Sequence, residues 1–411
     1  GTGIFTTSGF IVKELRDPGA LLLVWILGGI VALFGALSYS KLGRIFPKAG
    51  GEYAFLKETF GTPFGFLAGW VSLIVGFSAP IAATSIAFSK YFLELFKVED
   101  FEIYFNFSLS KFVAICTILV LSLIHLHKIS VGVNFQTAIT LSKILFILVL
   151  ITFGFLLGKE EFNSLRLEEL IPSKEAIFNQ SFPVSLIYVM YAYSGWNAST
   201  YVGEEIKNPQ RNIPLSLILG TLIVILLYLG LNLLYIRTLS IDEMAGVLEV
   251  GAKSVEKMFG NEFYFVFTGG ITIGLLSVLS AMIMAGPRVY YAMARDGVFF
   301  KSFSKVNPYT GTPTFSILFQ AMIAILMVLT STFEALILYI GFTLSLCSSL
   351  TVAGLFKIKK KLDLLALIFI LVNLWMVLFT VFTKPITLLW GTLTILTGLL
   401  LYFLFLKFKN Y

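Results

Sequence analysis

Two short segments interrupt the apolar helical pattern of this sequence and could bind a small zwitterion. The first is Gly1-Thr2-Gly3-Ile4-Phe5, and the second runs from Tyr191 through Ala192, Tyr193, Ser194, Gly195 and Trp196 to Asn197. Glycine within a membrane helix lets the backbone leave the helix, and its amides and carbonyls then need partners. N–H groups at a half-helix start suit a carboxylate, and carbonyls at a half-helix end suit an ammonium. Helix packing through small residues is the alternative interpretation of each segment.

Lys143 is a second candidate for chemistry, because at least 14 uncharged residues flank it on each side. A lysine at that depth in a membrane is costly unless it faces protein or water, which makes it a functional candidate. A snorkelling or cavity-lining lysine is the alternative. Ser277 and Ser280, spaced i and i+3, could supply hydroxyl partners or could bond to their own helix.

Acidic residues are absent from the middle of every apolar stretch. The sequence therefore predicts no buried carboxylate for a cationic amino acid or a polyamine. A neutral amino acid needs only backbone partners and an apolar pocket. Glu204 and Glu205 could instead form a closing ion pair with Arg44, Arg288 or Arg295 at the membrane surface, or could simply be solvated.

Composition excludes most other classes of protein. Of the 411 residues, 57% are hydrophobic and 13% are charged, whereas soluble proteins carry about 25% charged residues. No metalloprotease motif, paired carboxylates or Ser/His/Asp set indicates an enzyme. Cys116 and Cys347 lie in apolar runs, so we expect no metal site, no cofactor and no disulfide-linked ancillary subunit. The net charge of +7 is scattered, which argues against a nucleic-acid partner.

The elements that must position these residues are membrane helices, each needing about 20 residues to cross the bilayer. Residues 1–12 resemble the second half of one more span, so we expect 12 spans with the first half of span 1 missing. Eleven further stretches carry almost no charge: 18–40, 59–89, 112–127, 129–158, 176–203, 212–236, 263–287, 306–333, 335–356, 364–383 and 385–406.

Charge asymmetry between the connecting loops predicts orientation. One alternate set of loops holds 17 basic and 6 acidic residues, and the other holds 12 basic and 17 acidic residues. Basic loops remain in the cytoplasm. We therefore expect a multi-pass cell-membrane protein with both termini in the cytoplasm, forming one domain over residues 1–411.

Several motifs resemble those of the amino acid–polyamine–organocation (APC) superfamily, and in particular its L-type amino acid transporter branch. Gly1 to Phe5 is similar to a GxGIF signature, and Pro47 to Tyr53 to a P-x-x-GG-E-Y loop. The segment from Tyr193 to Asn197, followed by Glu204 to Pro214, resembles the span-6 signature. Met293 to Gly297 resembles the end of span 8. The resemblance implies two inverted five-helix repeats, residues 1–158 and 176–356, followed by two extra spans in 364–406.

The resemblance also implies residue roles. Backbone N–H groups around Gly1, Thr2, Gly3 and Ile4 would hold the substrate carboxylate. Carbonyls near Tyr191 and Ala192 would hold its amino group, with Tyr193 and Gly195 in the same broken segment. Tyr191 would act as an aromatic gate and Asn197 would lie near the substrate. The Lys143 ammonium would replace a sodium ion between spans 1 and 8.

These observations predict a sodium-independent secondary transporter of neutral L-amino acids that works by proton symport or by exchange. A carrier of amines, polyamines or cationic amino acids is the alternative within the transporter class. A non-transporting membrane sensor of amino acids is the alternative outside it. A channel is disfavoured because no repeated pore segment or ring of like charges occurs.

Overall fold

The computed structural model describes residues 2–48, 50–105, 107–127, 133–157 and 170–409. Almost all regular structure in these residues is helical, and the one β element among them is a short antiparallel hairpin of β1 and β2. The elements are α1 (Gly3–Leu15), α2 (Pro18–Ile45), α3 (Glu52–Phe60), α4 (Thr62–Val71), the π-helix η1 (Ser72–Ser78), α5 (Ala79–Leu95), β1 (Glu102–Tyr104), β2 (Phe107–Ser108), α6 (Leu109–Leu126), α7 (Val133–Leu157), α8 (Lys174–Ile177), α9 (Ser181–Tyr193), the 3-10 helix η3 (Ser194–Glu205), α10 (Pro209–Thr238), α11 (Ile241–Met244), α12 (Val250–Phe259), α13 (Asn261–Arg295), the 3-10 helix η4 (Lys301–Ser304), α14 (Thr314–Thr330), α15 (Phe333–Lys359), α16 (Leu364–Thr383) and α17 (Pro385–Lys409).

Helices occupy all eleven apolar stretches that the sequence marks. Within the described residues, eight helical segments are long and apolar enough to cross a membrane, and Thr140–Leu156 and Thr314–Thr330 are shorter apolar helices. The prediction of an all-α membrane protein is therefore confirmed. The count of twelve spans and the inverted repeats stay predictions.

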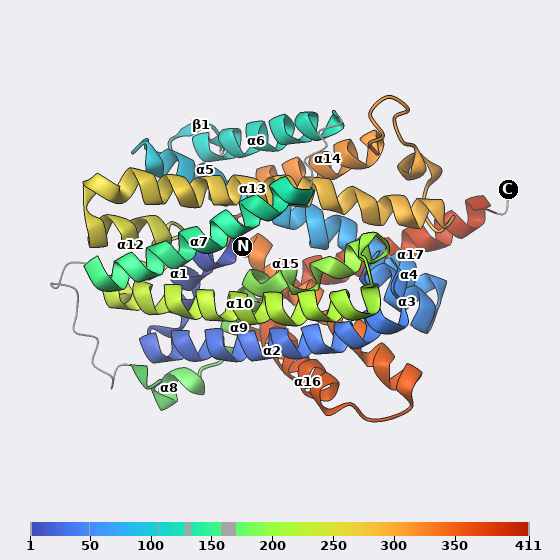
Figure 1. Cartoon of the computed structure of the whole chain (residues 1–411), viewed down its shortest axis with the longest axis horizontal. Coiled ribbons are helices and arrows are strands. Elements are labelled where there is room, and N and C mark those ends of the chain that lie inside the picture. Colours follow the sequence, from blue (N-terminus) through green and yellow to red (C-terminus); the bar gives the residue numbers. More distant parts are fainter. Residues whose placement is uncertain (1, 49, 106, 128–132, 158–169, 410–411) are drawn as a thin grey trace.

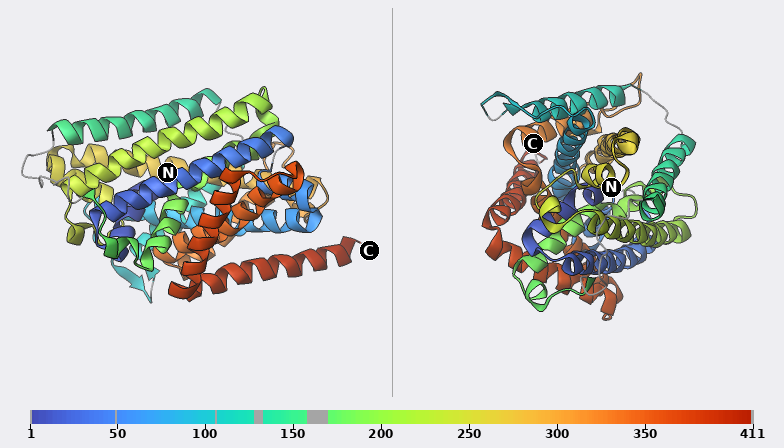
Figure 2. Two further views of the ribbon diagram at one scale, coloured as in Figure 1. Left: turned by 90° about the horizontal axis from the view of Figure 1, so that it is seen from below. Right: turned by 90° about the vertical axis from the view of Figure 1, so that its left-hand side faces the viewer.

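The long helices form an elongated bundle whose axis runs horizontally in Figure 1. The short helices α8 and α12 lie at one end of this axis, and α3 and the end of α17 lie at the other. Helices α8 and α12 belong to the more acidic set of connecting loops, whereas α3 and the end of α17 belong to the more basic set. Figure 2 shows α16 and α17 at the periphery of the bundle.

Burial separates an inner group of helices from an outer one. In α1 and α9 nearly every residue is buried. Of the 18 most apolar consecutive residues within Thr62–Leu95, 89% are buried. The corresponding share is only 22% in α6 and in α17. Large apolar side chains such as Leu226 and Phe382 are exposed on the outer group, as expected for surfaces in contact with lipid. The interior helices α1, α5 and α9 are therefore the ones that can position a site.

Irregular backbone lies within these interior helices. Helix α1 begins at Gly3, and α9 ends at Tyr193, where the chain tightens into η3. A π-helical segment, η1, separates α4 from α5; such bulges are frequent at functional sites. The segment from Tyr191 to Asn197 thus contains a real change of helix type, whereas Gly3 to Phe5 are helical. The π-helix η1 is an irregular segment that the sequence does not reveal.

Candidate functional site

The start of α1 and the end of α9 lie in direct contact. A Cβ atom placed on Gly3 would lie 2.4 Å from both Cα and Cβ of Ala192. No side chain fits at that distance, so glycine is required for the two helices to approach. In the first turn of α1 the Phe5 N–H donates to the Thr2 carbonyl at 3.2 Å, and the contact with Ala192 places this turn beside the last turn of α9.

A cavity of about 390 Å³ opens beside this contact and is called the first cavity below. Its lining contains no charged side chain among the described residues. It comes from α1, α5, α9, η3, α10 and α13 and comprises Thr2, Gly3, Pro80, Thr84, Tyr191, Ala192, Tyr193, Ser194, Gly195, Trp196, Ala198, Ser199, Ser216, Leu217, Gly220, Thr221, Val224, Tyr228, Val278 and Met282.

Polar groups of the first cavity come from the start of α1 and from α5, α9 and α10. The hydroxyls of Thr2 and Thr84 are 3.0 Å apart. The Tyr228 hydroxyl donates to the Ala192 carbonyl at 3.3 Å. The buried Tyr193 hydroxyl has no hydrogen-bond partner among the described residues, and a Cβ atom placed on Gly29 would lie 3.1 Å from it.

The first cavity brings together most of the residues expected to bind substrate. Six of the nine line it: Thr2, Gly3, Tyr191, Ala192, Tyr193 and Gly195. Ile4 is fully buried in the first turn of α1. Gly1 lies outside the described residues. Asn197 does not line this cavity but a neighbouring one. The carbonyl of Tyr191 accepts the N–H of Ser194, which ends α9.

A second cavity of about 320 Å³ adjoins the first at the broken segment. Tyr191 and the run from Ser194 to Trp196 line both cavities. The second cavity differs from the first because two charged side chains, Glu52 and Lys143, line it. Asn197 and Cys347 also contribute to its wall.

Glu52 corrects the expectation that no buried carboxylate is available, because its side chain is only 7% exposed. The preceding turn places Gly50 and Gly51 at φ +115° and +55° and directs the start of α3 into the bundle. The Glu52 carboxylate accepts hydrogen bonds from the Tyr39 hydroxyl at 3.1 Å, from the Asn197 amide at 2.5 Å and from the Tyr201 hydroxyl at 2.7 Å. The sequence pattern assigns Glu52 to a loop between two spans, and only the fold reveals its burial.

The structure separates one of the three residues predicted to couple transport from the other two. Lys143 and Ser277 line a third cavity of about 670 Å³ between α7, α10 and α13. Ser280 lies elsewhere, with its hydroxyl 2.8 Å from Nε2 of His125. Among the described residues the structure thus gives Ser280 a histidine partner rather than Lys143.

Of the predicted gating residues, Glu204 pairs with Arg295, at 3.8 Å between exposed side chains. Arg44 is exposed near the end of α2, and the Glu205 side chain lies outside the described residues. Arg288 lies in the last two turns of α13. Exposed pairs of this kind contribute little stability.

A shorter ion pair at the same end joins α3 to the end of α13. The Lys57 ammonium lies 2.6 Å from the Asp296 carboxylate, to which the Tyr53 hydroxyl donates at 2.8 Å. Partial burial alone would raise the pKa of Asp296, but these two donors hold that pKa below its usual value. The sequence analysis did not identify this pair.

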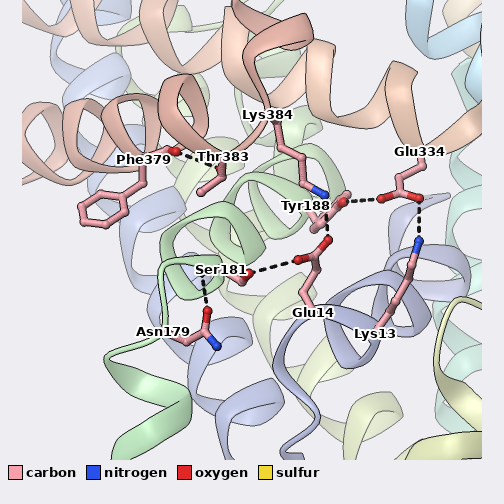
Figure 3. Close-up of polar contacts among 9 residues, drawn as sticks. All are labelled: Lys13, Glu14, Asn179, Ser181, Tyr188, Glu334, Phe379, Thr383 and Lys384. Atoms are coloured by element: carbon pink, nitrogen blue, oxygen red, sulfur yellow. Dashed lines mark hydrogen bonds and ion pairs between the residues drawn. The ribbon is translucent and has the colours of Figure 1, made fainter.

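A polar network closes the opposite end of the bundle (Figure 3). The Lys384 ammonium, between α16 and α17, lies 2.8 Å from Glu14 of α1. Glu334, at the start of α15, pairs with Lys13 at 3.3 Å and accepts from the Tyr188 hydroxyl at 3.0 Å. These contacts tie α1 and α9 to α15 and α16. Their residues are far apart in the sequence, so only the fold brings them together.

Comparison with known proteins gives one family. The model of the amino acid permease family matches residues 1–406. The serine/threonine exchanger SteT of Bacillus subtilis is 30% identical, over 80% of this chain and 73% of the relative. The human large neutral amino acids transporter small subunit 2 is 28% identical, over 98% of this chain and 77% of the relative. The human b(0,+)-type amino acid transporter 1 is 28% identical, over 100% and 85%.

Proposed function

The chain belongs to the amino acid permease family of the APC superfamily and is an amino acid transporter, and on that premise we propose that it carries neutral L-amino acids without sodium. Movement occurs by proton symport or by exchange. The family consists of transporters rather than enzymes, and the relatives described above are named for serine/threonine exchange or for large neutral amino acids.

One observation carries the choice of substrate: the described lining of the first cavity is uncharged, and it includes Thr2 and Gly3 at the start of α1 and Tyr191 to Tyr193 at the end of α9. The N–H groups at the start of α1 receive the substrate carboxylate. Carbonyls at the end of α9, among them that of Ala192, face the ammonium. A side-chain charge on the substrate would find no counter-charge in this cavity and would remain costly to desolvate.

The buried Glu52 makes a cationic substrate the second candidate, since a carboxylate in the neighbouring cavity could attract an ammonium or a guanidinium. Three donors already occupy that carboxylate. A cationic side chain would have to displace at least one of them. This competition favours the neutral substrate.

In this proposal residues 1–158 and 176–356 form two inverted repeats, with 364–406 as an added pair of spans. Helix α1 and the α9–η3 segment then hold equivalent places as first members of the repeats, where the transporters of this architecture bind substrate. The loop set containing Glu52 and Asp296 faces the cytoplasm, and both termini lie on that side. In the same proposal, the residues of Figure 3 lie at the end of the bundle that faces the outside of the cell.

Lys143 takes the place of a coupling cation in the same proposal. Its side chain lines the second and third cavities, and the third also includes Phe5 of α1. Lys143 therefore lies near the first turn of α1 but does not line the first cavity. A fixed ammonium there removes the need for sodium.

Both cysteines lie within membrane-crossing helices, Cys116 in α6 and Cys347 in α15. We therefore retain the expectation that no ancillary subunit is attached through a disulfide, although some relatives are named as small subunits. The partners proposed for this chain are the amino acid substrate and the lipid bilayer.

Uptake into proteoliposomes tests this proposal. We expect the full-length protein to take up neutral amino acids equally well in sodium and choline buffers. A symporter will concentrate substrate when a proton gradient is imposed, and Lys143→Ala will abolish that accumulation. An exchanger will require internal amino acid and will ignore the gradient. Sodium-dependent uptake would refute both versions.

A further inference from the structure

The carboxylate of Glu52 joins three elements at one point. The residue begins α3, Tyr39 donates to it from α2, and Asn197 and Tyr201 donate to it from η3. All three donors are themselves buried or half-buried. A buried carboxylate needs such donors to compensate for its lost hydration, so these contacts fix the position of η3 relative to α2 and α3.

The backbone of the preceding turn holds the same segment. The N–H of Gly50 donates to the Tyr201 carbonyl at 3.3 Å, and the N–H of Gly51 donates to the Thr200 carbonyl at 3.2 Å. A Cβ atom on Gly51 would lie 2.5 Å from the ring of Tyr201. The turn is therefore shaped to lie against η3, and Glu52 extends that contact into the second cavity.

Asn197 is the residue that connects this contact to the substrate site. Its Nδ2 atom lies 2.5 Å from Glu52 and 3.3 Å from the Tyr201 hydroxyl. Asn197 follows Trp196 directly, and Trp196 lines both cavities. For its amide to reach a ligand in the first cavity, Asn197 must leave Glu52, and η3 must move with it.

We propose that Glu52 is a positioning residue for transport, whose carboxylate holds η3 against α2 and α3 and keeps the Asn197 amide turned away from the first cavity. A bound substrate competes with Glu52 for that amide. When the substrate wins, η3 is released and the second cavity opens. This inference rests on the proposed function only for the identity of the competing ligand, because the contact itself exists without one.

Cys347 provides a reporter for the opening of the second cavity, since it lines that cavity together with Glu52. Cys116 is the other cysteine of the chain and lies in α6, away from both cavities. The experiment measures the rate at which N-ethylmaleimide labels Cys347 in the full-length, detergent-solubilised protein in a Cys116→Ser background. Each variant is measured without ligand, with L-serine and with L-leucine.

We expect Glu52→Ala to raise the ligand-free labelling rate at least tenfold. Glu52→Gln should stay within threefold of the parent, because its amide keeps an oxygen acceptor for Tyr39 and Asn197. An amino acid that the protein transports should accelerate labelling of the parent but not of Glu52→Ala. Glu58→Ala is the matched control, since Glu58 lies on the same helix and pairs with Lys48 near the surface; its rate should equal that of the parent.

Tyr201→Phe supplies a second test if Glu52→Ala fails to fold. It keeps the ring and removes one donor to Glu52, and it should raise the ligand-free rate about threefold. Parental rates in the folded Glu52→Ala variant or in Tyr201→Phe would overturn the inference. Equal acceleration by Glu52→Gln and Glu52→Ala would also overturn it. Failure of the proposed substrate class would leave the ligand-free rates unchanged, so the two failures can be told apart.

Discussion

The two segments proposed to form the substrate site, the start of α1 and η3, differ in how tightly they are packed. At the start of α1, a Cβ atom on Gly3 would collide with Ala192 at 2.4 Å. In η3, a Cβ atom on Gly195 would meet nothing within 4 Å. The carboxylate side of the proposed site is therefore rigid and the ammonium side has room to move. Glycine in the sequence marks both segments but does not distinguish close packing from open space.

The largest effect is expected on the rigid side, from Gly3→Val. A β-branched side chain at this position must separate α1 from α9. Substrate affinity should fall at least tenfold, which corresponds to about 1.4 kcal/mol. Isothermal calorimetry on the folded variant measures the change, with Gly220→Ala as control because Gly220 also lines the first cavity and has open space around it. An unchanged affinity would remove the α1 contact from the site.

A smaller effect is expected from Tyr193→Phe, on the α9 side. The Tyr193 hydroxyl is buried without a partner among the described residues, so the ligand-free protein should lose no stability when it is removed. If the substrate uses this hydroxyl, affinity should fall about fivefold, or about 1 kcal/mol. Calorimetry and thermal melting give the two quantities separately. Loss of stability at constant affinity would show a purely structural role.

Gly195→Ala should have a still smaller effect on binding. The added methyl group has space, and replacing glycine at a compatible position stabilises a protein by about 0.5 kcal/mol through the unfolded state. We expect affinity within threefold of the parent and a slightly higher melting temperature. A tenfold loss of affinity would mean that η3 is as closely fitted to the substrate as α1, and the contrast between the two segments would be lost.

The smallest effect concerns the support of the middle of α1, where the Gly246 N–H donates to the Gly9 carbonyl at 2.9 Å. Nearby, Lys257 of α12 holds the pKa of Glu243 of α11 at about 2, well below its ordinary value. This pair stabilises the fold at pH values above the usual glutamate pKa, and the contribution disappears as the pH falls through about 2.

Glu243→Gln should therefore lower the melting temperature slightly near pH 7, since exposed pairs contribute about 1 kcal/mol or less. The difference between variant and parent should shrink as the pH is lowered from 5 toward 2. Melting curves across that range test the sign. A difference that grows with acidity would contradict the assigned pKa shift.

Much of the fold and part of the site could be predicted from the sequence. Uncharged stretches of sufficient length predict membrane helices, because lipid imposes that pattern locally. Gly3 and Tyr191 could be chosen as site candidates because each lies in a short stretch whose own residues depart from the apolar helical pattern. Glu52 was not, since its burial depends on Tyr39, Asn197 and Tyr201, which are distant in the sequence. Ser280 failed as a Lys143 partner for a similar reason: helical spacing does not specify which neighbouring helix a hydroxyl faces.

We propose that an uncharged cavity binds an amino acid through its carboxylate at the start of α1. Thermal stabilisation of the full-length, detergent-solubilised protein by matched ligands is the decisive measurement. The panel comprises neutral L-amino acids, their methyl esters, L-arginine, L-lysine and putrescine. We predict stabilisation by one or more neutral amino acids and none by their methyl esters, by the cationic amino acids or by putrescine. Stabilisation by putrescine or by a methyl ester equal to that by the best neutral amino acid would contradict the claim.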